Sequence, residues 1–421
     1  MKKQESGYRW VVFGTALFAY FLIVSQRTAP GLITDQLMNE FHVSASLIGL
    51  ITSIQFLAYA GFQIPAGLLS DRYGPNHFLI FGTLLTGLGS LLYSVAPNEY
   101  VLILSRLLVG TGDATIFVNL ILILNQWFKA NEFIKLLGLI SLAGGLGSLA
   151  ATLPFSIWIS LSGWRTTFLS IGVILVITSY LLYTVLVSKP KTIFKEDFEG
   201  KKRPVRDREN VWLTLRRIFS TRQAWATFLC HFGLVGTYIG FIGSWGVPYG
   251  IHVLGLSLSE SSQLIMFGLF GVMMGGLSIG WVTSLLNSNK KIYTLVHIIV
   301  LISWMVLFLF GEKPPYIAVM VLFVIIGFCS GASSLTFAIV RESFPIKEVG
   351  VVTGFSNMGG FLSAVLLPIV FGYVLDLFPK DSIHIGYHYG FIISILFSLM
   401  GLIGVRLIKE EKVNKAVLST S

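Results

Sequence analysis

The stretch Gly67-Leu-Leu-Ser-Asp71-Arg72-Tyr-Gly74 decides how the rest of the chain is interpreted. It is a short polar segment between two apolar runs, each long enough to cross a bilayer. Its glycines allow helices to approach closely, and one acid–base pair stands where the chain meets water. Gln63 and Pro65 precede it. We interpret it as the hinge between the second and third of a series of membrane spans.

The composition agrees with a membrane protein that crosses the bilayer many times. Of the 421 residues, 54% are hydrophobic and only 12% are charged, whereas an ordinary soluble domain has about 25% charged residues. The only cysteines, Cys230 and Cys329, stand in apolar runs, so neither a disulfide framework nor a cysteine metal site is indicated. The net charge of +10 does not point to nucleic acid, because the basic residues follow the positive-inside pattern.

Twelve apolar runs have the length of about 20 residues that a helix needs to cross the hydrocarbon core. We place the spans near residues 8–27, 44–70, 77–96, 100–126, 133–160, 164–188, 223–250, 259–285, 291–311, 315–340, 348–376 and 387–408. The first run has spanning length and no small-residue cleavage site, which indicates an uncleaved span. The prediction is an all-α membrane protein of twelve transmembrane helices.

The positions of lysine and arginine predict the orientation. With both termini and the even-numbered connections on one side, 25 of the 30 basic residues fall on that side. That side is therefore the cytoplasm. The five exceptions are Arg27, Arg106, Arg165, Lys313 and Lys380.

The chain divides into two similar halves. Residues 1–188 form a first bundle of six helices, 189–222 a basic cytoplasmic linker, and 223–421 a second bundle with a short tail. Gly67 and Gly280 begin related segments, and the pair Gly144-Gly145 is answered by Gly359-Gly360. Duplication of this kind is typical of transporters with a substrate site between the halves. The linker is either a solvated connection, which we favour, or a lipid-headgroup or regulatory site.

Charged residues inside spans are costly, about 2.5–3.5 kcal/mol each at a helix centre, and are therefore candidates for function. Arg106 and Asp113 lie seven residues apart in the fourth span, on one face but about 10 Å apart along the helix axis. Each therefore reaches into a common cavity or takes a partner elsewhere. Asp113 is a proton site or a structural polar bridge, and the same alternatives hold for Arg106.

Arg27 follows the first span on the side that otherwise has almost no basic residues. One interpretation is an arginine that extends to the membrane interface. We favour the other, capture of a substrate anion, because a planar guanidinium binds a carboxylate through two hydrogen bonds.

Two further spans carry polar or aromatic side chains at helical spacing, which must face protein or water. They are Gln55, Tyr59 and Gln63 in the second span, and His231, Tyr238 and Trp245 in the seventh. Asn357 in the eleventh span is a weaker addition. They line a polar cavity or form hydrogen bonds between helices.

The chain resembles the major facilitator superfamily of secondary transporters over its whole length, and most of all the organic-anion branch, the anion:cation symporter group. The matching features are the hinge Gly67–Gly74, Arg27 after the first span, Tyr59-x-x-x-Gln63-x-Pro65-x-Gly67, Arg106 with Asp113, and Gly163-Trp164-Arg165-x-x-Phe168. The resemblance implies a monomer without a cofactor.

The resemblance also implies roles for individual residues. Arg27 would bind the substrate's carboxylate, and Asp113, with Arg106 beside it, would take part in proton coupling. Asp71 would belong to a cytoplasmic latch formed with its neighbours Arg72, Gly67 and Gly74.

The chain departs from this group at two positions. Gln26 stands where members commonly have an acid, and Asp113 replaces a glutamate. The departures call the number of coupled protons, and coupling itself, into question. The Gly-Pro pattern of drug/proton antiporters is missing from Gly144-Gly145-Leu-Gly147, which weighs against efflux.

The sequence therefore predicts a proton-coupled uptake transporter for a small organic anion in the cytoplasmic (inner) membrane. It contains no pattern typical of an enzyme, a metal site or a cofactor site. Two alternatives remain open: efflux of drugs or metabolites, and a sensor or scaffold that keeps the fold without transporting.

Overall fold

The computed structural model describes residues 6–190, 211–286 and 288–409, and within them the chain is helical. The helices of the first half are α1 (Tyr8–Arg27), α2 (Thr34–Phe41), α3 (Ala45–Tyr73), α4 (Pro75–Ser94), α5 (Glu99–Asp113), α6 (Ile116–Trp127), α7 (Ala130–Ala150), α8 (Leu153–Ser162) and α9 (Trp164–Tyr183). A 3-10 turn, η2 (Ala29–Leu32), follows α1, and a π turn, η3 (Thr184–Ser188), follows α9.

The second half repeats this arrangement. Its helices are α12 (Arg222–His231), α13 (Thr237–Ile242), α14 (Gly246–His252), α15 (Leu258–Leu286), α16 (Asn289–Leu309), α17 (Tyr316–Gly331), α18 (Ser334–Ser343), α19 (Ile346–Asp376) and α20 (Ile383–Leu407). A π turn, η5 (Phe232–Gly236), joins α12 to α13, and η6 (Lys380–Ser382) precedes α20.

The prediction of an all-α membrane protein is confirmed. In the described ranges, eleven helical segments are long and apolar enough to cross a membrane, and a twelfth is counted if the pair Gly138–Ala150 and Leu153–Ser162 forms one span. That pair is bent by 41° just before Pro154, which lies in the first turn of α8, where its missing N–H does no harm.

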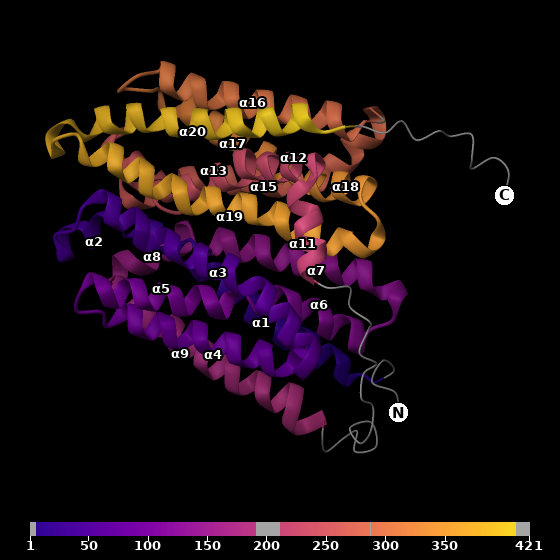
Figure 1. Ribbon diagram of the computed structural model, residues 1–421. Helices are drawn as coiled ribbons and strands as arrows, with labels where there is room; N and C mark the ends of the chain where they lie inside the picture. Colours follow the sequence, from indigo (N-terminus) through magenta and orange to yellow (C-terminus); the bar gives the residue numbers. More distant parts are fainter. Residues whose placement is uncertain (1–5, 191–210, 287, 410–421) are drawn as a thin grey trace.

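The two halves lie against each other along α3 and α19, which make the most extensive contact between them (Figure 1). The start of α1 and the end of α20 lie at one end of the bundle, which we call the terminal end, and α2 lies at the opposite end, which we call the α2 end (Figure 1).

The basic linker lies only partly within the described residues, because 191–210 fall outside them. Residues 211–220, predicted as a plain solvated connection, form the helix α11 (Val211–Ser220). Ile218 is buried in a cluster with Val340 and Val352, and Arg217 pairs with Glu348 of α19 at 2.9 Å. An apolar side chain among the charges therefore anchors this end of the linker to the second half, while the neighbouring described side chains of α11 are exposed.

The hinge at residues 67–74 is also shorter than predicted. The helix α3 continues to Tyr73, with Pro65 inside it, and Gly74 alone makes the turn. Its φ of 91° lies in the region that favours glycine. The side chains of Gln63, Asp71 and Arg72, and the surroundings of Gly67, lie outside the described part of the structure, so the latch stays a prediction.

Candidate functional site

The centre of the first half is an ion pair between Arg27 and Asp113. The Nε of Arg27 donates to one carboxylate oxygen at 2.9 Å, and a terminal nitrogen donates to the other at 2.8 Å. The Asp113 side chain is 4% exposed and the Arg27 side chain 23%. The two groups therefore satisfy each other, so Arg27 is paired inside the protein in this state.

Both partners are the last residues of their helices. Arg27 ends α1 shortly before the turn η2, and Asp113 ends α5 at the break before α6. A carboxylate at the carbonyl end of a helix is unfavourable, whereas a cation there is favourable. Asp113 at the end of α5 therefore requires a cation, and Arg27 provides it.

Arg106 lies beside this ion pair and does not belong to it. It is 1% exposed, donates to the side-chain oxygen of Gln55 and, at 3.3 Å, to the backbone carbonyl of Arg27. The Gln55 amide donates to the same carbonyl at 2.8 Å. The ring of Tyr93 lies 5.5 Å from the guanidinium carbon. Arg106 therefore braces the end of α1 against α3, which agrees with its interpretation as a structural bridge.

Aromatic rings cover the remaining side of Arg27. The ring of Tyr59 lies 5.5 Å from its guanidinium carbon. Across the boundary between the halves, the ring of Phe361 in α19 lies 4.5 Å from that of Tyr59. Tyr20 of α1 packs against Gly144 of α7, where a Cβ would lie 3.1 Å from the Tyr20 ring.

The α2 end of the bundle is closed by polar contacts between the halves. The Asp376 carboxylate at the end of α19 accepts from the backbone N–H groups of Ala45 and Ser46, at 2.8 and 2.9 Å, and so caps the start of α3. Thr34 donates to the carbonyl of Ser244 at 2.9 Å, and Thr52 shares a hydrogen bond with the Ser244 hydroxyl. The site at Arg27 is therefore sealed from this end.

One of the contacts that close the α2 end involves a histidine and depends on pH. His252, at the end of α14 and between two spans, pairs with Asp35 of α2 at 2.9 Å. The hydrogen bond to Asp35 raises the pKa of His252 above its ordinary value of 6.5. When the halves separate, the pKa returns toward that value. The pair therefore stabilises closure fully below about pH 6.5, and the contribution is lost as the pH rises through the raised pKa.

We expect the α2 end to open more often at pH 8.5 than at pH 6. The measurement is the distribution of distances between spin labels at Asn39 and Lys380, which are exposed on α2 and η6. In His252→Gln the glutamine keeps a hydrogen bond to Asp35 but does not titrate, so the distribution should no longer depend on pH. An equal pH dependence in this variant would assign it to another group.

The residues predicted in the second half separate into two groups. His231 shares a hydrogen bond with Thr336 at 3.2 Å, and Thr336 shares another with Tyr293 at 2.6 Å. Asn357 lies within hydrogen-bonding reach of His231. These side chains form one polar network inside the second half.

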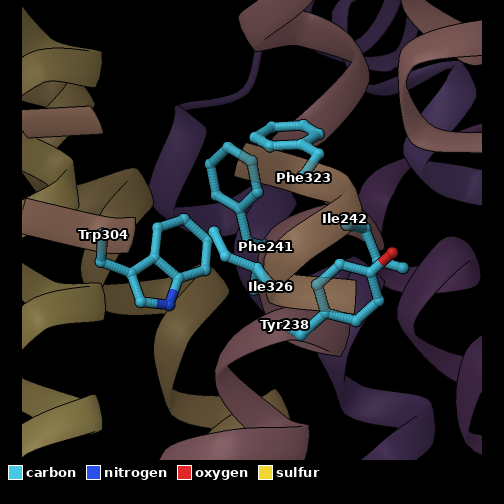
Figure 2. A pocket seen from close by; sticks show the side chains of 6 residues that line it. All are labelled: Tyr238, Phe241, Ile242, Trp304, Phe323 and Ile326. Atoms are coloured by element: carbon cyan, nitrogen blue, oxygen red, sulfur yellow. The ribbon is translucent and has the colours of Figure 1, made fainter. Parts of the chain in front are cut away.

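Tyr238 and Trp245 belong instead to the packing of the second half. Figure 2 shows Tyr238 with Phe241 and Trp304 around an apolar space that is too small to hold water. Trp245 donates to the carbonyl of Pro368 at 3.0 Å and stacks on Phe371. His231 and Trp245 both contact α19, at Gly360 and Pro368, whereas Tyr238 packs beside Phe241 and Trp304.

Comparison with known proteins agrees with this architecture. The family model of the Major Facilitator Superfamily matches residues 16–331 and, in a second match, 289–420. The chain is 27% identical over 419 residues to the sodium-dependent phosphate transport protein 1 of Arabidopsis thaliana, covering 95% of this chain and 79% of that protein. It is 23% identical to the hexuronate transporter of Bacillus subtilis, covering 83% of this chain and 84% of that protein.

The fold also matches a solved structure. A bacterial homologue of the human lysosomal transporter Spinster, in an inward-facing and unoccupied conformation, superposes with a TM-score of 0.76 at 17% identity. The match covers 96% of this chain and 98% of that one. The chain belongs to the Major Facilitator Superfamily and is a multi-pass membrane transporter, most similar to members of the anion-transporting branch.

Proposed function

We propose that the protein is a proton-coupled uptake transporter for a small organic anion, and that Arg27 binds the anion's carboxylate while Asp113 carries the proton. The observation that carries this proposal is the two-bond pair between Arg27 and Asp113, buried beside the boundary of the two halves. Relatives named for hexuronate and ascorbate support an acidic substrate.

The pair suits this role because a substrate carboxylate has the same shape and charge as the side chain of Asp113. It can replace Asp113 at the same two N–H donors of Arg27. The displaced Asp113 is then a buried carboxylate without a cation, which is unfavourable until it takes up a proton. Binding of the anion and uptake of the proton are coupled through one guanidinium.

The need for a neutral site couples the anion to the proton in every step of the transport cycle. The empty carrier holds Arg27 and Asp113 as a neutral pair, and the loaded carrier holds Arg27 with the substrate and a protonated Asp113, which is again neutral. Anion without proton would leave one unbalanced charge in the protein interior, which is costly. Gln26, uncharged and hydrogen-bonded to Ser90 at 3.1 Å, adds no second carboxylate, so one proton per anion is proposed.

Alternating access of the halves 1–188 and 223–421 completes the proposal. With the terminal end in the cytoplasm, as the basic residues predict, the α2 end faces outward and is closed, so the structure corresponds to an inward-facing state. Asp71 and its neighbours would then hold the opposite, outward-facing state.

Binding of carboxylates to purified protein tests the role of Arg27. A panel of small carboxylates and lipophilic cations is screened by thermal shift, since a ligand at one hundred times its dissociation constant stabilises the folded state by about 2.7 kcal/mol. In Arg27→Lys the charge remains but the two-bond geometry is lost, so we expect carboxylate affinity to fall at least about tenfold.

The double variant Arg27→Ala with Asp113→Asn serves as a control for stability, because it removes both members of the pair and leaves no unpaired charge. It should fold as well as Arg27→Lys and bind no carboxylate. Stabilisation by lipophilic cations that persists in both variants would contradict anion transport and favour efflux.

A further inference from the structure

Phe361 of α19 is a side chain of the second half that lies close to the Arg27 site. The guanidinium of Arg27 lies over the ring of Tyr59. The ring of Tyr59 also contacts that of Phe361, and the two ring centroids are 4.5 Å apart. Phe56, one turn earlier in α3, also contacts Phe361, at 6.2 Å between ring centroids.

Among the residues that the structure describes, this contact ends a series that joins α3 to α19. From the α2 end, the series runs through Ala45 with Asp376, Gly49 with Pro368, and Phe56 with Phe361, to Tyr59 with Phe361.

Beyond Tyr59 and Phe361, described residues of both helices lie beside open space. Phe62, one turn further along α3, is 49% exposed. Gly354 lies two turns before Phe361 on the same face of α19, and a Cβ there would meet nothing within 4 Å. Phe361 therefore lies where the described contact between α3 and α19 ends, near the partly exposed Arg27.

Two described polar side chains near this point already have partners. Gln55 is bonded at both ends of its amide, to Arg27 and Arg106. Asn357, one turn from Phe361, is directed to His231. The phenols of Tyr20 and Tyr59 also lie near Arg27, while the side chain that α19 places against Tyr59 is the apolar ring of Phe361.

We propose that Phe361 is a specificity-determining residue that packs against the body of the anion held by Arg27, and that the preferred substrates are carboxylates with an apolar body. This inference rests on the proposed function and narrows it. Hydroxyl groups placed against the ring would lose their hydrogen bonds to water without replacement, which disfavours sugar acids. The chain would then differ in substrate from the hexuronate transporter that it resembles.

The test compares two sets of acids of similar size on the full-length protein in detergent. Phenylacetate and cyclohexanecarboxylate represent apolar bodies, and gluconate and glucuronate represent hydroxylated ones. Dissociation constants are measured by calorimetry for the wild type, Phe361→Leu and Phe361→Asn. Phe355→Leu is the matched control, because Phe355 lies on the same helix but packs at 5.2 Å against Phe219 of α11.

We expect the wild type to bind the apolar acids at least about tenfold more tightly, the lower range of discrimination by an apolar pocket. Phe361→Asn should remove this preference, Phe361→Leu should keep its direction while weakening it, and Phe355→Leu should leave it unchanged. If the hydroxylated acids bind the wild type equally well or better, this inference is wrong and the proposed function stands. If neither set binds, the proposed function itself is wrong.

Discussion

Replacing Asp113 with asparagine is expected to abolish accumulation of the anion against its gradient while exchange of anion across the membrane continues. Without the carboxylate, the empty carrier holds Arg27 as an unpaired cation whose side chain is only 23% exposed. Breaking a buried pair costs about 3–5 kcal/mol, so return of the empty carrier should slow by more than about a hundredfold. During exchange the carrier is always loaded, and the substrate neutralises Arg27.

Both quantities are measured in proteoliposomes, as uptake driven by a pH gradient and as counterflow into vesicles loaded with the same anion. We expect counterflow to stay within about threefold of the wild type. Asp381→Asn, at an exposed acid of η6, is the matched control and should change neither rate. Concentrative uptake by Asp113→Asn at the wild-type rate would exclude Asp113 as the proton carrier.

The second large effect is expected at Gly49, where the two halves touch. A Cβ at this position would lie 2.6 Å from the carbonyl carbon of Pro368 in α19, closer than atoms can approach without movement. The contact lies between the halves and not within one of them, so Gly49→Val should fold but be unable to close the α2 end. Transport should fall by more than about a hundredfold, while carboxylate affinity changes by only a few-fold.

Gly14→Val is the control for the change in helix propensity, because a Cβ at Gly14 would meet nothing within 4 Å. Its transport rate should stay near that of the wild type. Opening of the α2 end in Gly49→Val is followed by the same spin labels at Asn39 and Lys380. A normal transport rate in this variant would show that the halves need not meet closely at Gly49.

Much of the architecture could be predicted from the sequence, because a helix in lipid must be apolar over its whole length. The same physics identified Arg27 and Asp113, since charges at membrane depth are costly and rare. Their pairing could not be predicted, because it depends on how α1 and α5 are rotated against each other, across 86 residues of chain.

Other features gave no signal in the sequence. Phe361 is one of 33 phenylalanines, and only its place opposite Tyr59 distinguishes it. In the sequence Asp376 is an ordinary acid at the end of a span. Only the structure shows that its carboxylate caps the start of α3. The π turn η5 between His231 and Tyr238 also gave no signal, because a π turn is not visible as a pattern of residue types.

The Arg27–Asp113 pair has an electrical consequence. In the proposed cycle a monovalent anion moves with one proton, and both moving forms of the carrier are neutral at this site. No net charge then crosses the membrane, so a potential worth about 2.3 kcal/mol per charge at 100 mV does no work on the cycle. Only the pH difference drives accumulation, about tenfold per pH unit, and transport should produce no current.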